Sequence, residues 1–174
     1  MSPTAPAARY LFDMSTDSDL LPESLLVISH STVAKLIYIS TRAGEDLLST
    51  ISLLSKKVFL HATQEDWRKL QRALGYLESI KMQKLKLGMT TPMTVRTYID
   101  ASFAVHFDFK SHIGIWFSLG VRCYCAKSTT QKIKTTSVCQ AEMVALAKGL
   151  QQSIYSAYFL AGQGYKSFSD EFSM

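Results

Sequence analysis

Apolar residues recur at helical spacing in three consecutive segments, residues 23–42, 44–58 and 63–81. Residues three, four and seven positions apart lie on one face of a helix, so each segment predicts an amphipathic helix. The expected core stripes are Leu26, Val33, Leu36 and Ile37 in the first segment, Leu47, Leu48, Ile51, Leu54 and Val58 in the second, and Trp67, Leu70, Leu74 and Leu77 in the third. Thr63 and Asp66 have the spacing of a capping box, which favours a start of the third helix at this point.

After Gly88 the pattern changes to the two-residue period of strands. Residues 95–101 alternate in polarity, and residues 113–119 and 121–126 are two further strand candidates. A glycine turn at Gly120 predicts that these two form an antiparallel hairpin. A basic polar stretch follows at 127–136, and then a long helix from Ser137 to the 162–164 stretch. Its expected stripe is Met143, Leu146, Ala147, Leu150, Ile154 and Tyr158.

The fold class expected from this order is α+β, with a helical segment followed by a three-stranded antiparallel sheet and a long helix. We expect a poorly ordered lead-in at residues 1–22, the helical segment at 23–88, the sheet unit at 94–165 and a tail at 166–174. No internal repeat is present.

Composition agrees with a folded protein, because 47% of the residues are hydrophobic and 19% are charged. The net charge of +5 is compatible with a polyanionic partner or with a solvated basic surface. Three cysteines without dense spacing favour small buried thiols in a reducing compartment over disulfides or zinc ligands. No apolar run is long enough to span a membrane and no signal peptide is recognisable, so a cytoplasmic or nuclear location is expected.

Two carboxylates are the candidates for chemistry. Asp100 lies near the end of the first predicted strand, and Glu142 lies in the first turns of the long helix. If the helix packs across the sheet, the two can converge and bind a hard cation such as Mg²⁺ through oxygen. Spacing alone is more typical of two surface carboxylates.

Several motifs in order resemble the polyprotein of copia-type LTR retrotransposons. The stretch YIDASFAVHFDFKSHIGIWFSLG, residues 98–120, is similar to the opening of the RNase H domain, and KSTTQKIKTTSVCQAEMVAL, residues 127–146, to its later Ala-Glu motif. Residues 30–48 and 66–77 are similar to the segment that follows the polymerase palm. The resemblance implies the end of a reverse-transcriptase region joined to the first half of an RNase H domain. It also implies that Asp100 and Glu142 are metal-binding catalytic carboxylates, with Mg²⁺ as cofactor and an RNA–DNA hybrid as partner.

The same resemblance implies residues that the sequence does not supply. A third Asp is expected on a strand after the long helix, but the sequence ends soon after Tyr165, and Asp170 and Glu171 lack the surrounding motif. We interpret those two as exposed tail residues. The polymerase motif Tyr-x-Asp-Asp is absent, and Val138 and Cys139 stand where relatives carry polar residues before the Glu.

Other polar residues are weaker candidates. His106, Asp108 and His112 suggest either a metal or base site or a loop whose side chains fix local turns. Trp67 and Trp116 are expected in the core rather than as stacking platforms. The candidates for nucleic-acid contact are Lys110, Ser111, Lys127, Lys132, Lys134 and Ser137.

Three functions follow as hypotheses. The favoured one is a retroelement remnant without independent catalysis. The second is a Mg²⁺-dependent RNase H that works when the missing sequence completes it. The third is a basic nucleic-acid-binding module without chemistry.

Overall fold

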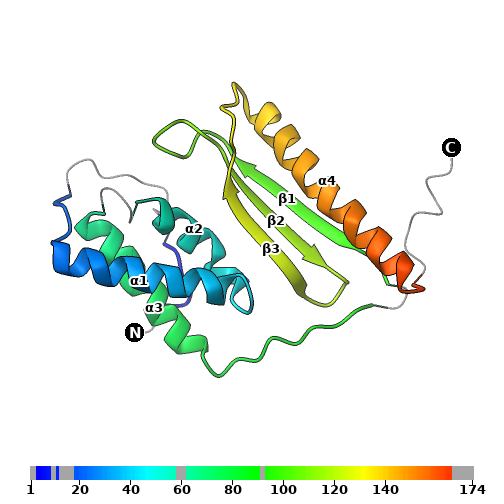
Figure 1. Cartoon of the computed structure of the whole chain (residues 1–174), viewed down its shortest axis with the longest axis horizontal. Coiled ribbons are helices and arrows are strands. Elements are labelled where there is room, and N and C mark those ends of the chain that lie inside the picture. The colour runs from blue at the N-terminus through cyan, green and yellow to red at the C-terminus, as the bar shows by residue number, and fades with distance from the viewer. Residues whose placement is uncertain (1–2, 9–10, 12–17, 58–61, 91–92, 166–174) are drawn as a thin grey trace. The chain divides into compact units, whose positions relative to one another are not determined.

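A computed structural model describes residues 3–8, 11, 18–57, 62–90 and 93–165 of the chain. The chain divides into two compact units, Met1–Leu85 and Lys86–Met174 (Figure 1). The helical unit contains α1 (Glu23–Ser40), the 3₁₀ helix η1 (Glu45–Leu47), α2 (Leu48–Lys57) and α3 (Gln64–Ile80). The sheet unit contains β1 (Arg96–Ser102), β2 (His112–Ser118), β3 (Cys123–Thr130) and α4 (Val138–Gly162). The expected α+β class is confirmed.

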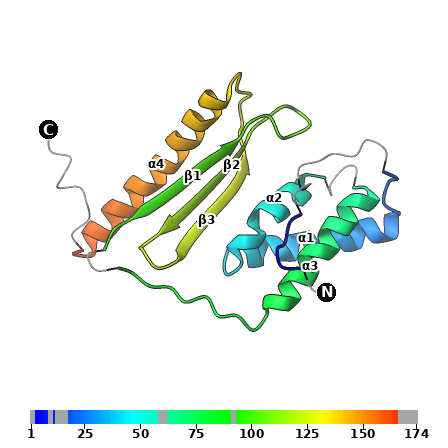
Figure 2. The same cartoon turned by 180° about the vertical axis from the view of Figure 1, so that it is seen from behind.

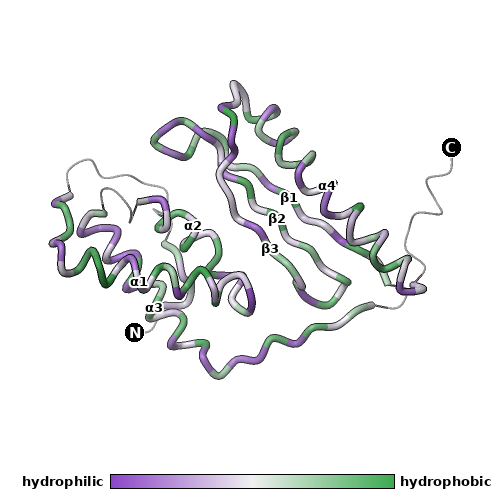
Figure 3. Tube along the Cα trace, in the orientation of Figure 1, coloured by the Kyte–Doolittle hydropathy of each residue, from purple (hydrophilic) through white to green (hydrophobic). Residues whose placement is uncertain are grey.

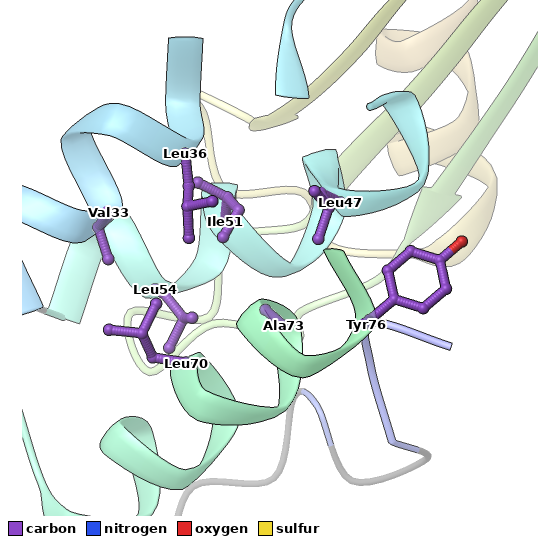
Figure 4. Close-up of a cluster of buried hydrophobic side chains, with 8 residues drawn as sticks. All are labelled: Val33, Leu36, Leu47, Ile51, Leu54, Leu70, Ala73 and Tyr76. Atoms are coloured by element: carbon purple, nitrogen blue, oxygen red, sulfur yellow. The ribbon is translucent and has the colours of Figure 1, made fainter. Parts of the chain in front are cut away.

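The helical unit closes around one apolar cluster drawn from α1, η1, α2 and α3 (Figure 4). Its members are Val33, Leu36, Leu47, Ile51, Leu54, Leu70, Ala73 and Tyr76. Most were expected from the helical stripes, but Ile37 and Leu74 are exposed, and Ala73 and Tyr76 are buried instead. Val58 lies outside the described residues. The Tyr76 hydroxyl donates a hydrogen bond to Asp46, and this bond raises the pKa of Tyr76 above its ordinary value.

The capping box expected at the start of α3 is confirmed. The Thr63 hydroxyl accepts a hydrogen bond from the backbone N–H of Asp66 at 3.4 Å, and the Asp66 carboxylate accepts one from the backbone N–H of Thr63 at 3.0 Å. These bonds satisfy two N–H groups that the helix itself leaves without partners, and so they fix where α3 begins.

The described part of the lead-in packs on the helical unit. Leu11 and Leu21 are buried, and the backbone N–H of Leu21 donates to the carbonyl of Ala62 at 2.9 Å. Lys69 of α3 lies outside the apolar stripe expected for that helix, yet only 5% of it is exposed. Its ammonium group donates to the carbonyl of Leu11 at 3.3 Å and pairs with Glu65 at 3.1 Å.

The sheet unit holds three antiparallel strands in the order β1-β2-β3. β1 and β2 pair so that Tyr98 lies opposite Trp116 and Asp100 lies opposite Gly114. The predicted end of the third strand was too early, because β3 continues to Thr130 and pairs along the whole of β2. The first four residues of the supposed polar loop, 127–130, are therefore part of the sheet.

α4 covers one face of this sheet. The Ser137 hydroxyl caps it by accepting from the backbone N–H of Gln140 at 3.2 Å. The apolar cluster beneath it comprises Ala101, Ile113, Ile115, Phe117, Ala141 and Ala145. Since successive strand residues point to opposite faces, the residues between these on β1 and β2 lie on the other face. Among the described residues of this unit α4 is the only helix, and we call the face it leaves uncovered the open face.

The apolar stripe of α4 that was expected to pack on the sheet lies on the opposite, exposed side of the helix. The buried positions are small residues, among them Ala141, Ala145, Gly149 and Ser156. The larger residues Met143, Leu146, Leu150, Ile154 and Tyr158 are between 46% and 71% exposed. We call these five residues the outer stripe. Figure 3 shows that hydrophobic positions recur along the length of α4. Small residues let α4 lie close to the strands, so its bulky side chains point away.

α4 lies along β1, the edge strand, and packs much less on the central strand β2; both Figures 1 and 2 show this arrangement. A helix centred on an edge strand leaves part of its apolar surface beyond the sheet.

We expect Gly149→Val to destabilise the sheet unit by at least about 1 kcal/mol, although valine is the better helix former. A Cβ at this position would lie 2.2 Å from Cδ1 and 2.7 Å from Cγ1 of Ile99, so the Ile99 side chain or α4 itself would have to move. Urea unfolding followed by circular dichroism measures the change. Gly162→Val, at a helical position where an added Cβ meets nothing within 4 Å, is the matched control and should have a smaller effect.

Candidate functional site

The two predicted carboxylates both lie near the end of β1. Asp100 is an exposed residue two positions before the end of that strand. Glu142 stands near the start of α4, and its Oε1 accepts a hydrogen bond from the backbone N–H of Ala101 at 3.3 Å. The Glu142 carboxylate therefore lies against the residue that directly follows Asp100.

The two acids approach β1 from opposite sides. Ala101 belongs to the apolar cluster under α4, so alternation places the neighbouring Asp100 on the open face. Glu142 comes from the helix on the covered face. β1 is an edge strand of the described sheet, so no other described strand lies between the two acids at the outer edge of β1.

The chemistry of this pair fits a hard divalent cation in part. Both side chains offer carboxylate oxygens, which Mg²⁺ prefers, and Mg²⁺ commonly keeps several water ligands when only one or two carboxylates hold it. Across the ranges that the structure describes, no cluster of three or more His, Cys, Asp or Glu side chains is placed to hold a metal. Asp170 and Glu171 lie outside those ranges.

His106 of the β1–β2 loop and His112, the first residue of β2, form a buried network that sequence analysis missed. His106 and His112 are 6% and 5% exposed, and Nε2 of His106 lies 3.0 Å from Nδ1 of His112. His112 also hydrogen-bonds to the Ser128 hydroxyl at 2.6 Å, and His106 to the Thr130 hydroxyl at 3.0 Å. The network ties the loop to β3, which agrees with the simpler expectation of side chains that fix the loop. The strand pairing that brings these residues together is not visible in the local sequence.

Two nucleic-acid candidates lie in the same loop. The Lys110 ammonium pairs with the Asp108 carboxylate at 2.7 Å, so part of its charge is neutralised. Ser111 is completely buried, and its hydroxyl bonds to the backbone N–H of Ala104 at 3.2 Å and to the Thr135 hydroxyl at 2.9 Å. Ser111 in this position supports the loop and cannot reach a ligand on the surface.

The remaining candidates surround the start of α4 and the end of β3. Lys132, Lys134 and Ser137 are exposed in the connection between them. Lys127 lies on β3 and donates to Gln152 of α4 at 2.9 Å. The surrounding sequence is strongly basic: residues 86–165 hold eight Lys and Arg and three Asp and Glu, a difference of +5 that equals the net charge of the whole chain.

The tryptophans and cysteines divide between core and surface. Trp67 packs against the helical core as expected, but Trp116 is 37% exposed on the open face. Placing Trp116 in the core was therefore wrong. The three cysteines are free; Cys123 is buried, whereas Cys139 is exposed, contrary to the expectation of buried thiols.

Comparison with known proteins gives no family assignment. No family model matches the chain, and neither the curated proteins nor the solved structures contain a significant match. Of the helices in the described ranges, none combines the length and the apolar character needed to cross a membrane.

Proposed function

We propose that this chain comes from a copia-type retrotransposon polyprotein. The helical unit would be the end of the reverse-transcriptase region. The sheet unit would be the first half of an RNase H domain, in which Asp100 and Glu142 are two of the catalytic carboxylates. In this proposal residues 1–174 do not cleave nucleic acid by themselves.

One observation carries the proposal: the hydrogen bond between Glu142 and the N–H of Ala101. It brings the helix carboxylate to the backbone of the residue that directly follows Asp100. The motif resemblance assigns catalysis to the same two residues, and it rests on the order of motifs along the chain, independently of where the residues lie in space. The contact supports the assignment because it brings Glu142 to the end of β1, where the resemblance expects its partner Asp100.

The packing of α4 also supports the proposal. α4 lies over edge strand β1, and its outer stripe is exposed. A further strand beside β1 would extend the sheet beneath α4 and could bring a third carboxylate next to Asp100. In the proposal, this strand belongs to the second half of the RNase H domain.

The roles of this chain's residues follow from where they lie. Asp100 and Glu142 would hold Mg²⁺, which in phosphodiester hydrolysis activates water and stabilises the leaving oxygen. Lys132, Lys134 and Ser137 are exposed near Glu142 in the sequence and would contact backbone phosphates of an RNA–DNA hybrid. The expected location is the cytoplasm or nucleus, where the cysteines remain reduced.

The test is an assay of the purified chain on a labelled RNA–DNA hybrid with Mg²⁺. We expect no cleavage above that of a buffer control, because the described residues place two carboxylates, and no third, at the proposed metal site. Cleavage that disappears in the Asp100→Asn variant would contradict the claim that this chain is inactive by itself. Cleavage that persists in that variant would indicate a contaminating nuclease, and the assay would then be repeated on repurified protein.

A second candidate function is nucleic-acid binding without chemistry, and the charge distribution favours it. The excess of +5 within residues 86–165 is a feature of the sheet unit alone. Affinity for a hybrid duplex that falls steeply with salt, without cleavage, would support this candidate. Binding that is absent or independent of salt would exclude it.

A further inference from the structure

The open face of the sheet carries two large aromatic side chains that the proposed catalytic site does not use. Tyr98 and Trp116 lie directly opposite each other on β1 and β2. Their ring centroids are 5.3 Å apart, with an interplanar angle of 59°. Tyr98 is 55% exposed and Trp116 is 37% exposed, whereas Phe117, the neighbour of Trp116 on the covered face, is 0% exposed. The exposed rings therefore form a pair and are not isolated surface residues.

The neighbours of this pair are small, so the rings are accessible. Ala126 of β3 lies opposite Trp116 on the other side, and Gly114 lies two residues before Trp116 on the same face. A Cβ built on Gly114 would meet nothing within 4 Å. The sheet thus has an aromatic surface with free space beside it, and we call Tyr98, Trp116, Gly114 and Ala126 the aromatic platform.

One cationic side chain lies close enough to the platform to contact an anionic group of a ligand. Arg96 is exposed on β1 two residues before Tyr98, and the strand period puts it on the same face. Asp100 is at the other side of Tyr98, so a positive group lies at one end of this row and a negative group at the other. Residues 86–165 of this unit hold eight Lys and Arg against three Asp and Glu, an excess of +5. A polyanion that also presents flat rings would match both the charge and the aromatic surface.

We propose that the aromatic platform binds unpaired bases of single-stranded nucleic acid, with Arg96 contacting the backbone phosphate. Bases stack on aromatic side chains with little sequence preference, because every base has a flat π face. In a duplex the bases are stacked on one another, so their flat faces are not accessible to side chains on a sheet surface. The site is separate from the carboxylate pair in its chemistry, and binding there needs no metal ion. This function goes beyond the proposed RNase H-like role and does not depend on it.

The experiment uses Trp116 as its own reporter. The chain has two tryptophans, so Trp67→Phe leaves Trp116 as the single one. In EDTA and low salt, a 12-nucleotide oligothymidine is titrated while tryptophan emission and the anisotropy of a labelled copy of the oligonucleotide are recorded. We expect saturable quenching of Trp116 that follows the anisotropy change. A blunt duplex of the same length should bind without quenching.

Variants locate the binding surface. Tyr98→Ala should weaken binding of the oligonucleotide by about ten-fold or more, the usual effect of removing one stacking ring. Tyr155→Ala, on α4 and 66% exposed, is the matched control and should bind as the parent does. Circular dichroism establishes that both variants are folded. Trp116→Phe keeps a ring at the second position and should retain most of the affinity measured by anisotropy.

Three results would overturn the proposal. One is an anisotropy change at saturation with no quenching of Trp116. Another is equal affinity of the Tyr98→Ala and Tyr155→Ala variants. The third is absence of oligonucleotide binding together with self-association that Tyr98→Ala abolishes, which would show that a second copy of the chain covers the platform. Because the readout is binding without metal, failure here leaves the cleavage assay unaffected, and an active chain in that assay leaves this test unaffected.

Discussion

Phe117→Ala should destabilise the sheet unit by about 3–5 kcal/mol, the usual cost of removing a large buried ring. Phe117 is 0% exposed and lies in the cluster between β2 and α4 with Ile115 and Ala145. The surrounding residues are short or belong to the sheet, so they cannot easily close the cavity. Domains commonly have only about 5–15 kcal/mol of stability, so this loss would leave the unit close to unfolded.

Urea unfolding checks this in the Trp67→Phe background, where emission from Trp116 reports on the sheet unit. Phe107→Ala is the matched control, because Phe107 is 70% exposed in the loop between β1 and β2. It should change the free energy of unfolding by less than about 0.5 kcal/mol. Equal effects of the two substitutions would mean that Phe117 is not the centre of a packed core.

Local signals predicted most elements of this fold. The helical stripes found Val33, Leu36, Ile51 and Leu70, all of them buried. The capping spacing at Thr63 placed the start of α3. These features depend on residues close in sequence, so the period and the cap chemistry carry enough information.

Packing between distant segments was much harder to predict, and α4 shows why. Hydrophobicity selected its bulky residues Leu146, Leu150 and Ile154, yet all three are exposed. The buried side has Gly149 and Ala145, which the sheet needs for close approach, since any side chain at Gly149 would meet Ile99. Size complementarity with a partner is a property of two segments and does not appear in the periodicity of one.

The choice of Asp100 and Glu142 as site residues came from the resemblance, and it stays a prediction. Spacing could not select them from 14 acidic residues, and the structure adds the hydrogen bond from the Ala101 N–H to Glu142. The two-residue period of a strand could have revealed the open face. Ile115 and Phe117 share one face of β2, so Trp116 between them lies on the other face. The contact of His106 with His112 depends on the conformation of the loop between them, and nothing in the local pattern specifies it.

If the chain is part of an RNase H domain, as proposed, the outer stripe and the edge of β1 indicate what the rest of that domain would supply. It would pair a strand with β1, pack an apolar element on residues such as Leu146 and Leu150, and bring acidic groups near Asp100. We expect that adding, as a separate polypeptide, the second half of a copia-type RNase H domain produces Mg²⁺-dependent cleavage of an RNA–DNA hybrid. Hydrophobic burial of the outer stripe would drive the association, since its side chains are about half exposed or more.

In that mixture, Asp100→Asn should lower the cleavage rate by about 100- to 1000-fold, because loss of metal-held charge in the transition state is worth several kcal/mol. Glu142→Gln should have a similar effect. Asp108→Asn is the matched control, because Asp108 pairs with Lys110 in the loop between β1 and β2, away from Ala101. The cleavage rate of this variant should stay within about three-fold of the parent.

Leu150→Lys tests assembly separately, since a charge on the outer stripe should weaken association of the two chains without changing the rate at saturation. If the chains associate, as shown by sedimentation, and the mixture still does not cleave, the two carboxylates do not form part of an RNase H site. If cleavage occurs and Asp100→Asn leaves it unchanged, the activity comes from other residues and the assignment of Asp100 fails.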